Sequence, residues 1–425
     1  MPRTPPYDPQ RHRTMIAAAW SEDAARQAIA AIVADAERAA DAAEPWPAHP
    51  LDDIDGWLPP AFYGLYSGAA GVIWALDRLA RLGATPRGAR FVDRMPDVLR
   101  HNRALLEPFL PDHAGYLQGD VGVLLVHWRL APRRDLADQL WQRIEANLAQ
   151  PSNELMLGVP GTLLAACFLH EETGEARFAR AVRDGFASLF AALGAADARG
   201  CRLWQQLFLG RSVAFVGLVH GFAGNAAALL RAAAHATPDE QRALHRVIRG
   251  TVQALAERDG DLANWPGVDP ADGSASAIER SATLVQICHG APGMIVGLRR
   301  LPATAPAGHD GEDTADVAAA RATEDLLRAG GELIWQAGPV AKGAGLCHGT
   351  AGNGYALLAL HQRTGDPLWL ERARAFAMQA IQQWREETAH YGRGRYSLWT
   401  GDVGLALYLW DCIRGEGEFP TVDTF

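Results

Sequence analysis

The stretch CHGTAGNGYALLALH, residues 347–361, places two glycines three positions apart at the start of a run of small and apolar residues. The same Gly-x-x-Gly pattern occurs seven times, with the first glycine at residues 68, 119, 158, 221, 290, 349 and 401. Each pair opens a comparable apolar run. A helix that is apolar on all sides is a buried helix. The sequence therefore predicts seven buried helices that share one starting motif.

Longer amphipathic stretches separate these apolar runs. In residues 15–43, 133–150, 174–194 and 366–387, apolar residues return every three or four positions with charged residues between them. This spacing predicts helices with one buried face. The alternation fits an all-α double α/α toroid of seven inner and seven outer helices, formed by residues 1–425 as a single domain. An open α-solenoid is the alternative, but its concave face is normally polar.

The charge pattern argues against several classes of partner. The chain carries 49 acidic and 40 basic residues, and its net charge of −9 is spread along the sequence. Nucleic acids and anionic membranes bind concentrated basic surfaces, so we expect neither as a partner. We also expect no membrane span and no signal peptide, because the sequence lacks a sufficiently long apolar segment. Five irregularly spaced cysteines do not form a disulfide framework, so we expect a reduced, cytoplasmic protein. We also expect a monomer.

Reactive residues precede three consecutive motifs. They are His220, the pair Cys288 and His289, and the pair Cys347 and His348. If the buried helices run parallel, their N-termini gather at one end of the ring, where the helix dipoles favour anions. Equivalent positions in adjacent repeats are then neighbours. These side chains are therefore expected to converge at that end.

A cluster of cysteine and histidine in a reduced protein indicates zinc. Cys347 and His348 can reach one ion together, and Cys288 can add a third ligand. The spacing leaves open whether His289 is a fourth ligand. Three protein ligands with one open position are typical of catalytic zinc, which lowers the pKa of a bound thiol. The other three cysteines lack such partners and are expected to be core residues.

The sequence resembles the lanthionine synthetase C-like family over nearly its whole length. The stretches that carry the resemblance are VHGFAGN at 219–225, CHGAPG at 288–293 and GLCHGTAGN at 345–353, within seven motifs in order. The resemblance implies a seven-fold double α-toroid with one zinc ion at its centre. Bacterial cyclases of this family add a peptide cysteine to dehydroalanine or dehydrobutyrine. Stand-alone eukaryotic-type members bind glutathione and add it to dehydrated residues in damaged proteins.

The resemblance also implies roles for particular residues. Cys288, Cys347 and His348 match the ligands of the single zinc ion. His220, in the HGFAG motif, matches a general acid or base. His289 is left beside the zinc without binding it and is a further catalytic candidate.

A second group of residues matches less specific family positions. Glu154 corresponds to an acidic catalytic residue before the third motif; the alternative is a carboxylate attracted by a helix N-terminus. Lys342, five residues before the second cysteine ligand, corresponds to a lysine that contacts glutathione. Arg3 and one of Arg393 or Arg395 correspond to arginines of that pocket; the alternative for these arginines is a solvated surface charge.

The chain departs from the bacterial cyclases at the first cysteine ligand. Those enzymes usually have Trp-Cys-Tyr-Gly there, with an arginine four residues before the cysteine. This chain has Ile287, His289 and Leu284 at the three positions. The resemblance therefore favours the glutathione-adding branch: zinc-dependent addition of a thiol, from glutathione or a peptide cysteine, to dehydroalanine or dehydrobutyrine in a peptide or protein.

Other functions remain as alternatives. One is a lanthipeptide cyclase acting on a precursor that a separate enzyme dehydrates, since no dehydratase segment is present. Another is a non-catalytic zinc protein that binds glutathione or a peptide. An α/α-toroid glycosidase needs two carboxylates across its pocket, and only Glu154 is suitably placed. A zinc prenyltransferase lacks this pattern of cysteine and histidine before Gly-x-x-Gly.

Overall fold

The structure, a computed structural model, describes residues 6–42, 44–53, 56–88, 91–110, 113–208, 210–273, 275–276, 280–304 and 314–425. These residues form fourteen α-helices and four short strands. The prediction of a mostly helical protein is confirmed. Arg3, which the family resemblance assigned to substrate binding, lies outside the described residues.

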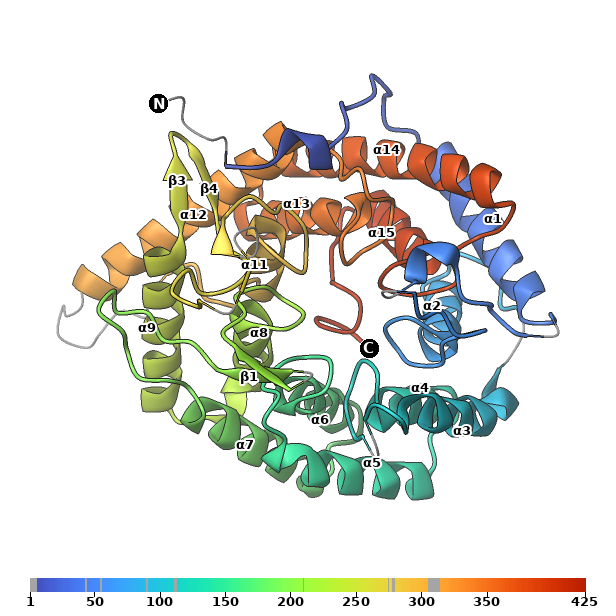
Figure 1. Cartoon of the computed structure of the whole chain (residues 1–425), viewed down its shortest axis with the longest axis horizontal. Helices are drawn as coiled ribbons and strands as arrows, with labels where there is room; N and C mark the ends of the chain where they lie inside the picture. Colours follow the sequence, from blue (N-terminus) through green and yellow to red (C-terminus); the bar gives the residue numbers. More distant parts are fainter. Residues whose placement is uncertain are drawn as a thin grey trace.

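Seven helices begin immediately after the first glycine of a motif. They are α2 (Ala69–Arg81), α4 (Asp120–Leu130), α6 (Val159–Thr173), α8 (Phe222–Ala232), α11 (Ala291–Gly297), α13 (Thr350–Thr364) and α15 (Asp402–Arg414). Each contacts the next in this order, and α15 contacts α2. Figure 1 shows them around a common centre. Most of their side chains are buried, as the apolar runs predict.

The other seven helices lie outside this group (Figure 1). They are α1 (Glu22–Ala39), α3 (Met95–Leu106), α5 (Arg134–Ala146), α7 (Ala176–Ala191), α9 (Pro238–Leu255), α12 (Thr314–Ala337) and α14 (Pro367–Tyr391). Helix α9 illustrates their design. Its N-terminus is fixed by a capping box between Thr237 and Glu240, and it buries Leu244, Ile248 and Val252 along one face.

Short elements complete the described chain. Two antiparallel hairpins, which the sequence analysis did not predict, pair β1 (Gln206–Phe208) with β2 (Arg211–Val213) and β3 (Glu257–Asp259) with β4 (Leu262–Asn264). Single turns of 3-10 helix are η1 (Pro9–Arg11), η2 (Pro50–Asp52), η3 (Val92–Arg94), η4 (Asn147–Ala149) and η5 (Ala233–His235). In the described part of the chain, every helix is too short or too polar to cross a membrane.

The second glycine of each motif closes a tight turn. A β-carbon at Gly352 would lie 1.8 Å from the carbonyl oxygen of Leu346, six residues earlier. The corresponding distance in the other six motifs is between 2.0 and 2.2 Å. No side chain fits there, so glycine is required by close backbone approach. Among the glycines of the seven motifs, only Gly290 has a positive φ, of 101°.

The first backbone N–H groups of the inner helices are bonded to the loops before them. The N–H of Thr350 donates to the carbonyl of Gly343 at 2.9 Å, and the N–H of Phe222 donates to Phe215 at 3.0 Å. Both bonds span seven residues. These donors would otherwise be available to an anion. The helix dipole remains at this end of the ring, but these N–H donors are already used.

The C-terminal segment occupies the centre of the ring (Figure 1). Phe425 packs against the rings of Trp74, Tyr116 and Phe168, with centroids 5.5, 6.3 and 5.6 Å away. The hydroxyl of Tyr116 also donates to the carbonyl of Thr421 at 2.8 Å. The centre is therefore filled by protein from the side where the inner helices end.

Replacing Gly352 by alanine tests the tight turn. We expect Gly352→Ala to lower the free energy of unfolding by about 1–3 kcal/mol, because the added carbon overpacks a backbone contact. Gly250→Ala, within α9, is the matched control: a β-carbon there meets nothing within 4 Å, and alanine favours helix. Urea denaturation should therefore move the two midpoints in opposite directions. Equal midpoints would show that the turn tolerates a side chain.

Candidate metal centre

In five consecutive motifs around the ring, the residues two positions before the first glycine are linked by backbone hydrogen bonds. The N–H of Cys288 donates to the carbonyl of Cys347 at 3.2 Å, and the N–H of Cys347 donates to Trp399 at 2.7 Å. The N–H of Trp399 donates to Tyr66 at 3.1 Å, and the N–H of Tyr66 donates to Leu117 at 2.8 Å. We call this series the loop ladder. It holds equivalent side chains of neighbouring repeats at one level.

Cys288, Cys347 and His348 converge at this level. Their ligand atoms all lie within 4.8 Å of one another, and among the described residues this group is the one that could hold a metal ion. Cys347 is buried, whereas Cys288 and His348 are half-buried. Two thiols and one imidazole form a donor set suited to zinc. No atom of His289 belongs to the group.

The two thiols are electrostatically different. The Cys288 thiol donates a hydrogen bond to Cys347, which lowers the pKa of Cys347 and raises the pKa of Cys288. His348 lowers the pKa of Cys347 further. Burial also raises the pKa of Cys288, whereas the positive charge of Lys342 lowers it. Cys347 is therefore the residue that most readily supplies the thiolate that a metal requires.

Close backbone contacts position the Cys288 loop. A β-carbon at Gly217 would lie 1.7 Å from the carbonyl oxygen of Cys288, so only glycine lets the two loops meet. Gln286 and His289 exchange backbone hydrogen bonds of 3.0 and 3.1 Å on either side of the cysteine. The amide of Gln286 also donates to the sulfur of Cys288 at 3.1 Å. The sequence analysis did not identify Gln286 as a site residue, because it belongs to no recurring motif.

His220 and Glu154 form a pair in the adjacent repeats. Nδ1 of His220 lies 3.0 Å from Oε2 of Glu154. Glu154 is fully buried, and its carboxylate accepts backbone hydrogen bonds from Met156 at 2.8 Å and Leu157 at 2.6 Å. The carboxylate therefore holds the loop before α6 and orients the imidazole at the same time. This geometry is compatible with both interpretations of Glu154 given above, a catalytic acid and a carboxylate near a helix N-terminus.

The predicted substrate-binding residues differ in their surroundings. Lys342 is exposed. Arg393 is half-buried and donates to the carbonyl of Ala48 at 2.7 Å. Arg395 is buried and pairs with Asp52 at 2.5 Å, so it is not a solvated surface charge. Both arginines thus hold the segment before α2 against the ring.

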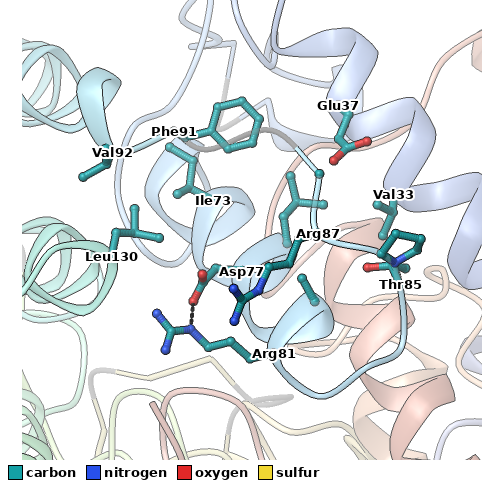
Figure 2. Close-up of a pocket in the computed structure, with 14 residues that line it drawn as sticks. Val33, Glu37, Ile73, Asp77, Arg81, Thr85, Arg87, Phe91, Val92 and Leu130 are labelled. Atoms are coloured by element: carbon teal, nitrogen blue, oxygen red, sulfur yellow. Dashed lines mark hydrogen bonds and ion pairs between the residues drawn. The ribbon is translucent and has the colours of Figure 1, made fainter.

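A separate cavity of about 320 Å³ lies at the other end of the inner helices (Figure 2). The second half of α2 and the last residue of α4, Leu130, contribute to its lining, with Val33 and Phe91. Figure 2 shows the ion pair of Asp77 and Arg81 at its edge. None of the described site residues lines this cavity, and it has no part in the metal centre.

Comparisons with known proteins are consistent with this arrangement. The family model for lanthionine synthetase C-like protein matches residues 59–424. The chain is 29% identical over 281 residues to LanC-like protein GCL1 of Arabidopsis thaliana, covering 63% of this chain and 57% of that protein. It is 37% identical over 145 residues to Glutathione S-transferase LANCL1 of Danio rerio, covering 32% of this chain and 31% of that protein. Both alignments span less than two thirds of the relative.

A solved structure shares the fold. The structure of Nisin cyclase matches with a TM-score of 0.57 over 92% of this chain and 94% of that chain. The sequence identity is 13%, so the match is one of architecture.

Metal analysis tests the candidate centre. We expect purified protein to hold about one zinc per chain, and Cys347→Ala and Cys288→Ala each to lose most of it. Cys167→Ala is the control, because Cys167 is a buried thiol within α6, outside the metal-binding group, and should leave the zinc content unchanged. Full zinc occupancy in both ligand variants would exclude this site.

Proposed function

The chain belongs to the lanthionine synthetase C-like family, and we propose that it adds a thiol to dehydroalanine or dehydrobutyrine residues to form a thioether. The observation that carries this proposal is the convergence of Cys288, Cys347 and His348 in the repeats that follow the pair of His220 and Glu154. A thiol-adding enzyme needs both a site that activates sulfur and a group that moves a proton. We also assign the fourteen helices to a double α/α toroid, on the cyclic contacts of its seven inner members.

In this proposal Cys288, Cys347 and His348 hold one zinc ion. Bound there, zinc would lower the pKa of an incoming thiol so that it reacts as a thiolate near neutral pH. Three protein ligands leave a fourth position for that thiol. The pair of thiols must stay reduced to bind metal, which favours a reducing compartment such as the cytoplasm.

His220 is the proposed proton donor. When sulfur bonds to the β-carbon of a dehydroamino acid, the electron pair of the C=C bond moves toward the α-carbon and its carbonyl. A proton must then reach the α-carbon. Glu154 orients the imidazole through Nδ1 at 3.0 Å. His289, outside the metal-binding group, remains a second candidate for proton transfer.

Lys342 is the proposed contact for the donor thiol. It is the only lysine among the 40 lysine and arginine residues of the chain. It is exposed, yet its charge acts on Cys288. Glutathione carries two carboxylates that could pair with it, and one relative has the printed name Glutathione S-transferase. We therefore propose glutathione as the donor and a dehydrated peptide or protein as the acceptor.

Replacing His220 separates catalysis from metal binding. We expect His220→Asn to retain zinc and to slow glutathione addition to a dehydroalanine peptide by about 10²-fold or more, since general acid–base catalysis contributes that much. His245→Asn, on the outer helix α9, is the control and should leave the rate unchanged. Zinc content and product formation by mass spectrometry measure the two effects. Unchanged turnover in His220→Asn would assign the proton transfer to another group.

Replacing Lys342 tests the choice of thiol. Because Lys342 is exposed, we expect Lys342→Ala to raise the KM for glutathione only about two- to fivefold. The neutral thiol β-mercaptoethanol, which has no carboxylate, should react as before.

Lys342→Arg keeps the positive charge and should retain most of the preference for glutathione. An equal loss for both thiols in Lys342→Ala would indicate a disturbed site instead. If the wild-type protein ignores glutathione and closes rings in a dehydrated peptide that contains cysteine, the chain is a cyclase.

A further inference from the structure

Thr421 has left-handed backbone, with a φ of 63°, in the segment that fills the centre of the ring. This conformation is unfavourable for a β-branched residue, so the surrounding structure must hold it. A tight turn does so: the N–H of Thr421 donates to the carbonyl of Thr424 at 2.9 Å, and the N–H of Asp423 donates to Phe419 at 2.9 Å. Thr421 is fully buried. Strained residues of this kind are concentrated at functional sites.

Two polar atoms of Thr421 bind the loops that precede inner helices. Its hydroxyl oxygen accepts the indole N–H of Trp399 at 3.1 Å, and its carbonyl accepts the hydroxyl of Tyr116 at 2.8 Å. Trp399 lies in the loop before α15, and Tyr116 lies in the loop before α4. The ring of Phe419 also packs edge-on against Trp399, with centroids 5.1 Å apart. The segment after α15 therefore supports the loop ladder from inside the ring.

Trp399 transmits this support to a metal-binding residue. Its carbonyl accepts two N–H groups from the loop before α13, from Leu346 at 2.8 Å and from Cys347 at 2.7 Å. Its ring also stacks on Tyr66, with centroids 5.4 Å apart and planes inclined by 25°. Trp399 is fully buried, so its ring and its backbone have little freedom to move apart from their neighbours. Thr421, Trp399 and Cys347 therefore form one continuous series of contacts.

We propose that Thr421 is a positioning residue of the metal centre: it fixes Trp399, and Trp399 holds Cys347 at the metal-binding level. This inference rests on the proposed function, in which Cys347 is a zinc ligand. Residues that orient a ligand without touching the metal contribute to metal affinity. The support comes from beyond the last repeat, so an irregular segment of the chain completes a site that the repeats build.

Zinc affinity tests this inference apart from catalysis. We expect Thr421→Val, which keeps the branched shape but leaves the indole N–H without its acceptor, to bind zinc about 10- to 100-fold more weakly, the usual range for residues that support metal ligands. Thr421→Ser keeps the hydroxyl and should bind zinc as tightly as the wild-type protein. Competition with a chromophoric chelator measures the affinity of each folded protein.

The matched control is Thr251→Val, on the outer helix α9. Thr251 is also fully buried, and its hydroxyl accepts the N–H of Arg202 at 3.1 Å. Urea denaturation should show that both valine variants are less stable than the wild-type protein, but only Thr421→Val should lose zinc affinity. If Thr421→Val does not fold, Trp399→Phe removes the same hydrogen bond and takes its place. Trp204→Phe, which removes another buried and bonded indole N–H, is then the control.

The outcomes distinguish the two proposals. Weaker zinc binding in Thr421→Val, with wild-type affinity in Thr421→Ser and Thr251→Val, supports the role of Thr421. Unchanged affinity in folded Thr421→Val overturns this inference and leaves the proposed function standing. An equal loss of affinity in Thr421→Ser or in Thr251→Val also overturns it, because the loss then does not depend on this hydroxyl. A wild-type protein that binds no zinc overturns the metal centre and this inference with it.

Discussion

A backbone carbonyl stands where a β-carbon would be at the second glycine of every motif, and the rest of the architecture depends on that contact. It turns the chain sharply into each inner helix, so the residues just before the helix have one permitted path. Seven copies of the same turn place seven loops at one level, where they bond to one another in the loop ladder. Cys288 and Cys347 meet because they hold equivalent places in consecutive copies.

The same turn changes the electrostatics of this end of the ring. Gathered helix N-termini normally offer backbone N–H groups to anions. Here several of the first N–H groups donate to carbonyls seven residues earlier, such as Thr350 to Gly343. In the proposed reaction, selectivity for a thiolate must therefore depend on side chains and on the proposed metal more than on the backbone N–H groups of the helix ends. The histidines before three of the motifs, and the hydrogen bond from Gln286 to the sulfur of Cys288, provide those side-chain contacts.

The sequence patterns predicted the structural features that recur in every repeat. They did not predict the features that occur in one repeat alone. The recurrence of Gly-x-x-Gly predicted the seven apolar helices and the shared level of Cys288, Cys347 and His348, because register is a local property. The two hairpins and the pairing of Arg395 with Asp52 depend on segments that no repeat relates.

The filled centre of the ring limits how substrates approach. Phe425 packs inside the ring against Trp74 and Phe168, and Thr421 accepts the indole N–H of Trp399 directly beneath the loop ladder. The metal-binding level therefore has protein below it and is reached from the end where the inner helices begin. In the proposed reaction, the thiol and the dehydrated peptide must then share one entrance. Under that proposal, an acceptor residue within a longer chain can reach the sulfurs only from an exposed, extended loop or terminus.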